Sequence, residues 1–199
     1  SISWLTLTDA GDGTATLTGT PANGDVGDHS VTVTVTDAAA AAGTQTFTIT
    51  VANTNDAPTI SSTAVTAATE DAAYTYTVTA ADVDSGDTIT LTGTTVPSWA
   101  TFTASTGVLA GTPDNDDVGD HSVVITASDG TASVTDTFTI TVANTNDAPT
   151  ITSTAVTAAT EDVAYTYTVT AADVDSGTTI TLTGTTVPSW ATFTASTGV

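Results

Sequence analysis

An all-β fold of tandem, seven-stranded Greek-key β-sandwiches is predicted for this chain by three observations. The string VANTNDAPTI occurs at positions 51–60 and again, unchanged, at 142–151, which gives a repeat period of 142 − 51 = 91 residues. This period is close to the roughly 100 residues of one seven-stranded sandwich domain. Apolar residues alternate with threonine along most segments, and Gly, Pro, Asp and Asn collect between the alternating runs, as in short strands joined by turns.

The repeat frame divides the chain into three parts. SWATFTASTGV begins at Ser98 and again at Ser189, and GTP-x-N-x-DVGDHS also occurs twice. We assign residues 1–55 to the C-terminal half of one repeat, 56–146 to a complete repeat and 147–199 to the N-terminal half of the next. A half-sandwich exposes its apolar face and its strand edges. We therefore expect each half to be completed, either by further repeats of a longer chain or by a neighbouring copy.

The alternating runs predict seven strands in the complete repeat. YTYTVTA, TITLTGT and DTFTITV place threonine on one face and apolar residues on the other, as in half-buried strands. No segment has the periodicity of an amphipathic helix. The predicted strands span 59–66, 73–81, 88–94, 99–103, 107–112, 121–128 and 133–143. The side chains expected to face the core are Trp99, Phe102, Ile89, Leu91, Val123, Ile125, Phe138 and Ile140.

The composition restricts the partners of the chain. It has 22 acidic residues and no Lys or Arg, for a formal net charge of −22. Nucleic acids and anionic membranes are bound through basic side chains, so we expect neither as a partner. No apolar run approaches the roughly 20 residues that span a bilayer, so direct membrane insertion is not expected. The chain also has no cysteine for disulfides, which leaves bound cations as the expected stabiliser of this self-repelling chain.

The acidic residues recur in the same loops of successive repeats. The two glutamates, Glu70 and Glu161, both stand just before the second predicted strand of a repeat. In an immunoglobulin-type topology, the loops after the second and sixth strands lie at one pole, and those after the first and fifth lie at the other. The acidic loops therefore collect where neighbouring repeats meet.

These residues carry a family resemblance. NTNDAP resembles the cadherin interdomain linker, AADVDSGD resembles the cadherin DAD loop, and the glutamate before the second strand resembles the cadherin glutamate ligand. VPSWATFTASTGVLAGTP followed by DVGDHSVVITASDG resembles the dystroglycan-type cadherin-like (putative-Ig) repeats of large bacterial surface proteins and adhesins. The resemblance covers the whole chain. It implies immunoglobulin/cadherin-like sandwiches whose junctions bind Ca²⁺ and are stiffened by it.

Carried over by position, the resemblance implies two sets of metal ligands. Calcium takes six to eight oxygen ligands from carboxylates, amides and main chain, which these residue types can supply. The alternative is that they are solvated turn residues, since Asp and Asn favour turns. The first junction would use Asp25, Asn53, Asn55, Asp56, Asp82, Asp84 and Asp129. The second junction would use Glu70, Asp117, Asn144, Asn146, Asp147, Asp173 and Asp175.

Two other motifs do not support their functional interpretations. DVDSGD is no EF-hand, because it runs into a strand and has no glutamate at the twelfth position. The tripeptide DHS contains the residue types of a hydrolase triad, but neighbouring side chains of a strand point to opposite faces. We therefore expect His29 and His121 to be structural, and Trp4, Trp99 and Trp190 to be core anchors.

The sequence thus predicts a non-enzymatic, extracellular, calcium-stiffened repeat array that acts as spacer, stalk or filament of a cell-surface adhesin. Its expected partners are neighbouring repeats of the same chain or fibre. One alternative is a module that binds carbohydrate, a cell-surface ligand or like repeats on another cell. A second is a linker region of a secreted polysaccharide-degrading enzyme.

Overall fold

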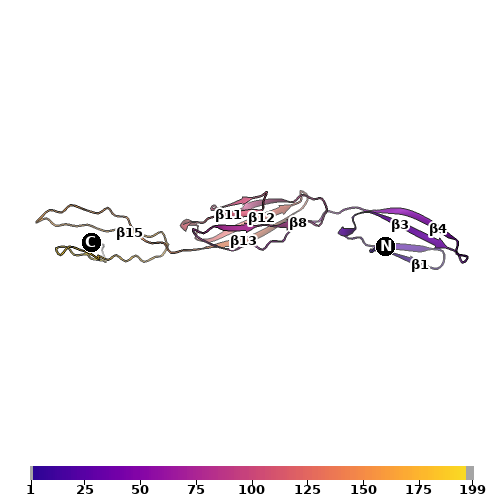
Figure 1. Ribbon diagram of the computed structural model, residues 1–199, viewed down its shortest axis with the longest axis horizontal. Coiled ribbons are helices and arrows are strands. Elements are labelled where there is room, and N and C mark those ends of the chain that lie inside the picture. The colour runs from indigo at the N-terminus through magenta and orange to yellow at the C-terminus, as the bar shows by residue number, and fades with distance from the viewer. Residues whose placement is uncertain (1, 196–199) are drawn as a thin grey trace. The chain divides into compact units, whose positions relative to one another are not determined.

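Strands are the principal regular elements of the part of the chain that the structure describes. The computed structural model describes residues 2–195, and Figure 1 shows its strands as arrows. The described residues contain no α-helix, and their only helical elements are two single 3-10 turns, η1 (Asn23–Asp25) and η2 (Asn115–Asp117). Contacts divide the chain into two compact units. The first comprises the residues up to Thr63 with Val78–Thr94 and Ile125–Asp136, and the second comprises Ala64–Thr77, Thr95–Val124 and the residues from Thr137 on.

The strands fall where threonine alternates with apolar residues, because this pattern lets one face of a pleated strand be buried while the other stays in water. Their bounds are β1 (Leu5–Asp9), β2 (Ala15–Gly19), β3 (Gly27–Thr36), β4 (Ala42–Val51), β5 (Thr59–Ile60), β6 (Ala67–Thr69), β7 (Tyr74–Thr77), β8 (Ala80–Ala81), β9 (Thr90–Thr95), β10 (Ala100–Thr103), β11 (Val108–Gly111), β12 (Gly119–Ser128), β13 (Ser133–Ala143), β14 (Thr150–Ile151) and β15 (Ala171–Ala172).

The first unit is built from antiparallel pairs. Strand β1 pairs with β2, β3 pairs with β4 over their full length, and the short strand β5 pairs with β8. Val31 on β3 is buried, whereas the neighbouring threonines face solvent. On that outer face, the Thr32 and Thr46 hydroxyls lie 3.0 Å apart, and Thr50 Oγ1 donates to Asp28 Oδ1 at 2.6 Å.

Strands of the second unit surround an apolar core. Strand β11 lies between β10 and β7, and β6 runs parallel to β13. Strands β6, β13, β12 and β9 form one sheet in that order, and most of β9 belongs to the residues of the first unit. Leu109, Val123 and Ile140 are fully buried. A glycine is required at Gly111, because a Cβ there would lie 2.1 Å from the Trp99 carbonyl oxygen.

Two of the predicted strands are shorter than the sequence pattern indicates, and their continuity was predicted wrongly. The segment 59–66 forms a strand only at β5, since the chain then leaves its pairing with β8 and joins β13 through β6. The segment 73–81 is interrupted between β7 and β8, where the Thr79 amide donates to the Ser62 hydroxyl at 3.0 Å instead of to a neighbouring strand. The alternation of side chains does not reveal these changes of partner.

The described residues after Asp147 contain little regular structure. Strand β14 pairs with β15, and the remaining chain up to residue 195 forms no further strand. Figure 1 accordingly draws this C-terminal part mostly as a coloured tube rather than as arrows.

Candidate metal centres

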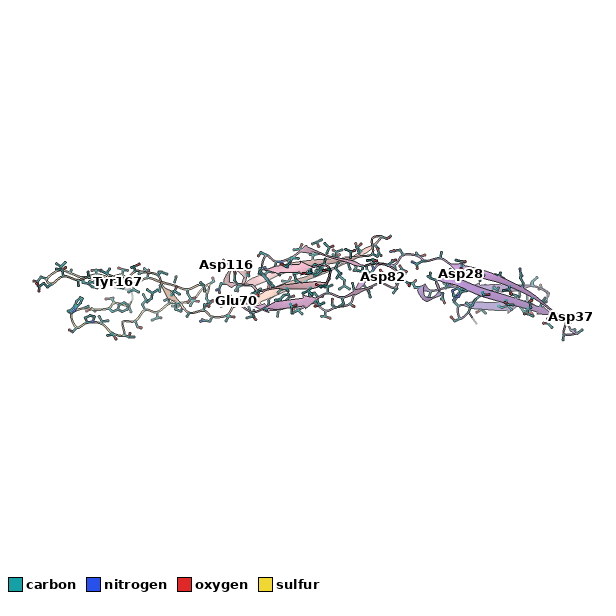
Figure 2. The ribbon with its side chains drawn as sticks, turned by 45° about the horizontal axis from the view of Figure 1, so that its top comes forward. Asp28, Asp37, Glu70, Asp82, Asp116 and Tyr167 are labelled. Carbon is teal, nitrogen blue, oxygen red and sulfur yellow. The ribbon has the colours of Figure 1, made fainter. Side chains whose placement is uncertain are left out.

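Three carboxylates from distant parts of the sequence converge within the second unit. Oxygen atoms of Glu70, Asp147 and Asp175 all lie within 4.8 Å of one another. Glu70 is only 2% exposed and Asp175 only 7% exposed. The Glu70 amide donates to the Ala143 carbonyl at 3.1 Å, which fixes Glu70 beside the end of β13 (Figure 2). The three groups come from the predicted complete repeat, from the linker and from the following repeat.

Hydrogen bonds fix one oxygen of several of these acids and leave the other without a partner. The Thr145 amide donates to Glu70 Oε1 at 2.8 Å, and the Asp147 amide donates to Asp175 Oδ2 at 2.7 Å. The Asp175 amide donates to Asp173 Oδ1 at 3.0 Å. Among the acids near this centre, the buried oxygens without a hydrogen-bond partner are Glu70 Oε2, Asp173 Oδ2 and Asp175 Oδ1. A buried anionic oxygen without a partner is costly, so this arrangement fits a cation.

Asn115 also belongs to this centre, although the sequence analysis did not select it. Its Nδ2 donates to Asp147 Oδ2 at 3.0 Å, while its Oδ1 is buried without a partner. Asn146 Nδ2 donates to the Asp147 carbonyl at 2.8 Å. A signal was present in the sequence, because this asparagine recurs as Asn23 in the repeated GTP-x-N-x-DVGDHS motif.

Asp117 and Asn144, which the sequence also selected for this junction, are placed outside the three-carboxylate group. Asp117 Oδ2 accepts a hydrogen bond from the Asp114 amide at 3.1 Å, so this carboxylate caps η2. Asn144 is exposed to solvent.

A second group of acids lies within the first unit. Oxygen atoms of Asp82, Asp84 and Asp87 lie within 4.8 Å of one another. The Asp56 amide donates to Asp84 Oδ2 at 2.7 Å, and the Asp84 amide donates to Asp82 Oδ1 at 3.0 Å. Asp82 Oδ2 and Asp84 Oδ1 are buried without a hydrogen-bond partner. The loop and the linker therefore have the same arrangement as at the other junction.

Amide side chains tie the linker to this first group. Asn23 Nδ2 donates to Asp56 Oδ2 at 2.7 Å, and Asn55 Nδ2 donates to Asp129 Oδ2 at 3.0 Å. Of the remaining residues selected from the sequence, Asp25 accepts a hydrogen bond from the nearby Ala22 amide at 2.9 Å. Asn53 is exposed.

In the group of Asp82, Asp84 and Asp87, the negative charges repel one another. Partial desolvation raises the pKa of Asp87, and the negative charges of Asp84, Asp82 and Asp129 raise it further. In contrast, hydrogen bonds from the Ala132 and Thr131 amides and from Asn55 lower the pKa of Asp129. The chain has no Lys or Arg that could neutralise these groups. An oxygen-rich anionic donor set of this kind suits a hard divalent cation such as Ca²⁺.

The histidines lie in structural surroundings. The His121 ring packs edge-on against Trp99, with 5.9 Å between ring centroids, and its Nε2 lies 2.6 Å from the Asp117 carbonyl oxygen. His29 has the same relation to Trp4 and Asp25. The neighbouring Asp120 instead accepts a hydrogen bond from the Thr141 hydroxyl at 2.6 Å.

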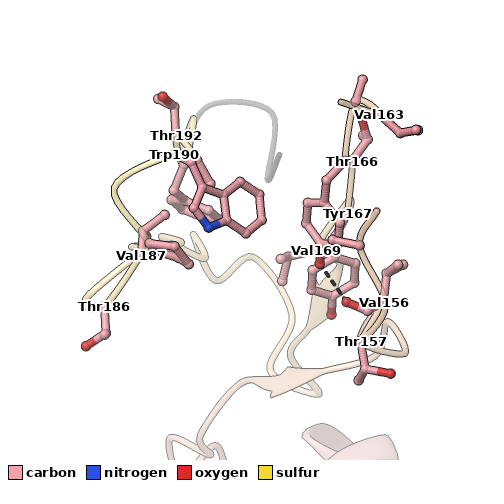
Figure 3. Close-up of a pocket in the computed structure, with 16 residues that line it drawn as sticks. Val156, Thr157, Val163, Thr166, Tyr167, Val169, Thr186, Val187, Trp190 and Thr192 are labelled. Atoms are coloured by element: carbon pink, nitrogen blue, oxygen red, sulfur yellow. Dashed lines mark hydrogen bonds between the residues drawn. The ribbon is translucent and has the colours of Figure 1, made fainter. Parts of the chain in front are cut away.

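A cavity lies among the residues that follow Asp147, and its lining includes none of the acids of either group. It has a volume of about 700 Å³, and its lining includes Val156, Tyr165, Val187, Trp190 and Phe193 (Figure 3). The Tyr165 hydroxyl donates to the Val156 carbonyl at 2.6 Å.

Comparison with known families identifies the chain. The family described as "Putative Ig domain" matches residues 3–52, 57–143 and 148–199. The chain belongs to this Ig-domain family. No curated protein matched it in the sequence comparison.

Solved structures of two kinds resemble this Ig-domain chain. Extracellular cadherin domains 1–4 of protocadherin gamma B7 match with a TM-score of 0.51 at 20% identity, over 89% of this chain and 49% of theirs. Human protocadherin-24 matches over 62% of this chain and 64% of its own, with 25% identity and a TM-score of 0.45. An endo-fucoidan hydrolase of glycoside hydrolase family 107 is 33% identical over 72% of this chain, with a TM-score of 0.41.

The chain spans only 22% of that hydrolase and about half of the protocadherin gamma B7 structure. The family match and the protocadherin gamma B7 likeness confirm the predicted all-β immunoglobulin/cadherin-like fold and the resemblance read from the sequence. The structure contains no helix, among its described residues, that is long and apolar enough to cross a membrane.

Proposed function

We propose that this chain is a non-enzymatic, extracellular array of Ig/cadherin-like repeats in which bound Ca²⁺ holds neighbouring repeats together. One observation carries the proposal: Glu70, Asp147 and Asp175 converge although they precede, occupy and follow the linker. Buried oxygens of Glu70 and Asp175 have no hydrogen-bond partner, and the chain has no Lys or Arg to neutralise them. Solvated turn residues would not need to be buried together.

The residues that would hold the ion are Glu70, Asp147 and Asp175, with the Asn115 amide oxygen as a further donor. Calcium would neutralise their mutual repulsion and complete the bonding of their unpartnered oxygens. Since the ligands come from both sides of the linker, binding requires that the linker keep one conformation. Any ligand that binds only the ordered junction also stabilises it. Calcium would thereby convert a flexible connection into a stiff one.

The biological role that fits such junctions is a spacer, stalk or filament of a cell-surface adhesin. The partners of each repeat would then be its neighbours in the same chain or fibre. The exposed hydroxyls on the outer face of β3 and β4 and the net charge of −22 suit a surface in contact with water outside the cell.

Isothermal titration calorimetry of the chain with CaCl₂, after removal of metal by a chelator, tests the proposal. We expect saturable binding that Mg²⁺ does not reproduce, because Mg²⁺ requires stricter octahedral geometry and retains its waters. The variant Glu70→Gln should lose or weaken a binding step. Glu161→Gln is the matched control, since Glu161 has the same sequence context but is exposed. Absence of calcium binding by the unaltered chain would contradict the proposal.

A further inference from the structure

The chain contains two versions of the acidic loop that differ in one charge. The first reads AADVDSGDT and places Asp82, Asp84 and Asp87 in one group. The second reads AADVDSGTT, so that Thr178 stands where the first loop has Asp87. Because the other residues of the two loops are identical, any difference between the loops must arise from this position or from the surroundings.

The geometry around Asp87 indicates a ligand position rather than a simple turn residue. Its carboxylate lies within 4.8 Å of those of Asp82 and Asp84. Asp84 is 95% buried (5% exposed), and its Oδ1 has no hydrogen-bond partner. Asp82 Oδ2 is likewise buried without a partner. Two buried carboxylate oxygens in need of a partner thus lie in the same group as the exposed Asp87.

The charges that face Asp87 are all negative. They belong to Asp82 and Asp84 in its own loop and to Asp129 from the loop between β12 and β13. The Asp129 carboxylate is itself tied to the linker through Asn55. A turn could use a neutral residue at position 87, as the second loop does with Thr178. Placing a further carboxylate among three others is unfavourable unless a cation is shared between them.

We propose that Asp87 is a side-chain ligand that completes a calcium subsite at the first loop, and that the second loop lacks this subsite because of Thr178. The inference rests on the proposed function, since it assumes calcium binding at these junctions. It makes the two loops unequal. The first loop would bind calcium more tightly than the second, because ligand charge sets the affinity of calcium sites.

Reciprocal substitution tests this inference in the full chain. Asp87→Thr gives the first loop the sequence of the second, and Thr178→Asp does the reverse. Calcium titrations by calorimetry should show that Asp87→Thr weakens the tightest step about tenfold or removes one bound ion, because one charged oxygen donor is lost. Thr178→Asp should add an ion or strengthen the weaker step. Asp87→Asn, which keeps an oxygen donor without the charge, should lie between the unaltered chain and Asp87→Thr.

The outcomes separate this inference from the proposed function. If the unaltered chain binds calcium and both exchanges leave the number and affinity of the ions unchanged, Asp87 is a turn residue and the inference is wrong, while the proposed function stands. If the unaltered chain binds no calcium, both fail. Circular dichroism in chelator should be the same for all variants, since Asp87 and Thr178 are exposed, and this control excludes misfolding as the cause of weaker binding.

Discussion

Nearly the same sequence has two different structures in this chain. In the copy at 57–143, Tyr74 is 5% exposed and packs edge-on against Trp99, which in turn packs against His121. In the copy that follows, Tyr165 packs in the same way against Trp190, but Trp190 is 66% exposed. The edge-on contact between this pair of tyrosine and tryptophan rings therefore forms from nearby sequence, whereas the burial of the ring pair depends on other strands.

The side chains that bury the ring pair of the earlier copy are identifiable. In the earlier copy, Tyr76 contacts Phe138 of β13, and His121 of β12 lies against Trp99. The corresponding side chains of the later copy instead line the cavity of about 700 Å³. The repeated glutamate shows the same contrast in burial. Glu70 is buried beside the end of β13, while Glu161 is exposed. The long-range partners, rather than the local sequence, thus form both the core and the metal centre.

The largest expected change in the free energy of unfolding comes from replacing the tryptophans. Trp99→Ala should lower the free energy of unfolding by about 3 kcal/mol, since it removes a large packed side chain. Trp190→Ala removes the same side chain from an exposed position and should cost less than about 1 kcal/mol. Differential scanning calorimetry of both variants measures the contrast. Equal costs would mean that the two copies are packed alike.

The next largest effect is the change in stability when the buried Glu70 is replaced, and the sign of this change depends on calcium. In chelator, Glu70→Gln should raise the melting temperature, because it removes one negative charge from an unneutralised buried group and keeps an oxygen for the Thr145 amide. With calcium it should remove up to about 2–3 kcal/mol of ligand stabilisation.

Thermal unfolding of Glu70→Gln and Glu161→Gln in both conditions checks this effect. Glu161→Gln should show neither change in stability, because Glu161 is exposed. A stabilising effect of Glu70→Gln that persists in calcium would argue against an ion at this centre.

A smaller effect is expected from the tyrosine hydroxyls. The Tyr74 hydroxyl donates to the Val65 carbonyl at 2.7 Å, as Tyr165 does to Val156. Tyr74→Phe should cost about 1 kcal/mol, the net value of one buried hydrogen bond. Tyr165→Phe should cost less, because its surroundings are open to water. Urea unfolding curves of the two variants provide the measurement, and a larger cost at Tyr165 would reverse the comparison.

The last effect appears only at high pH. Burial, and to a lesser extent the nearby Tyr76, raises the pKa of Tyr74 to about 12. The folded chain then retains the Tyr74 proton in a range where the unfolded chain has released it. This contribution to stability is complete below about pH 10 and is lost as the pH rises towards 12. Tyr74→Phe should flatten the decline in melting temperature above pH 10, and an unchanged slope would show that Tyr74 titrates normally.

The sequence was sufficient for those features that depend on local pattern. Strand β13 has the predicted bounds, and the apolar positions Val123, Ile125 and Ile140 are fully buried as expected. The structure also brings together the linker acid Asp147 and the buried Glu70, two of the residues that the resemblance implied as ligands of the second junction.

The sequence was insufficient where a residue's partner depends on tertiary packing. The orientation of an asparagine side chain cannot be read from its position in a motif, so the hydrogen bond from Asn115 to Asp147 was missed. For the same reason the capping of η2 by the Asp117 carboxylate was not expected. The break after β7 depends on the Ser62 hydroxyl, which an alternating pattern does not record.

Thermal unfolding of the unaltered chain in calcium and in chelator tests the central claim most directly. At a calcium concentration about 100 times the dissociation constant, one bound ion should stabilise the folded chain by about 2.7 kcal/mol. We therefore predict a melting temperature several degrees higher in calcium, with Mg²⁺ giving little of this increase. An identical melting temperature in calcium and in chelator would contradict the account and leave the buried carboxylates without an explanation.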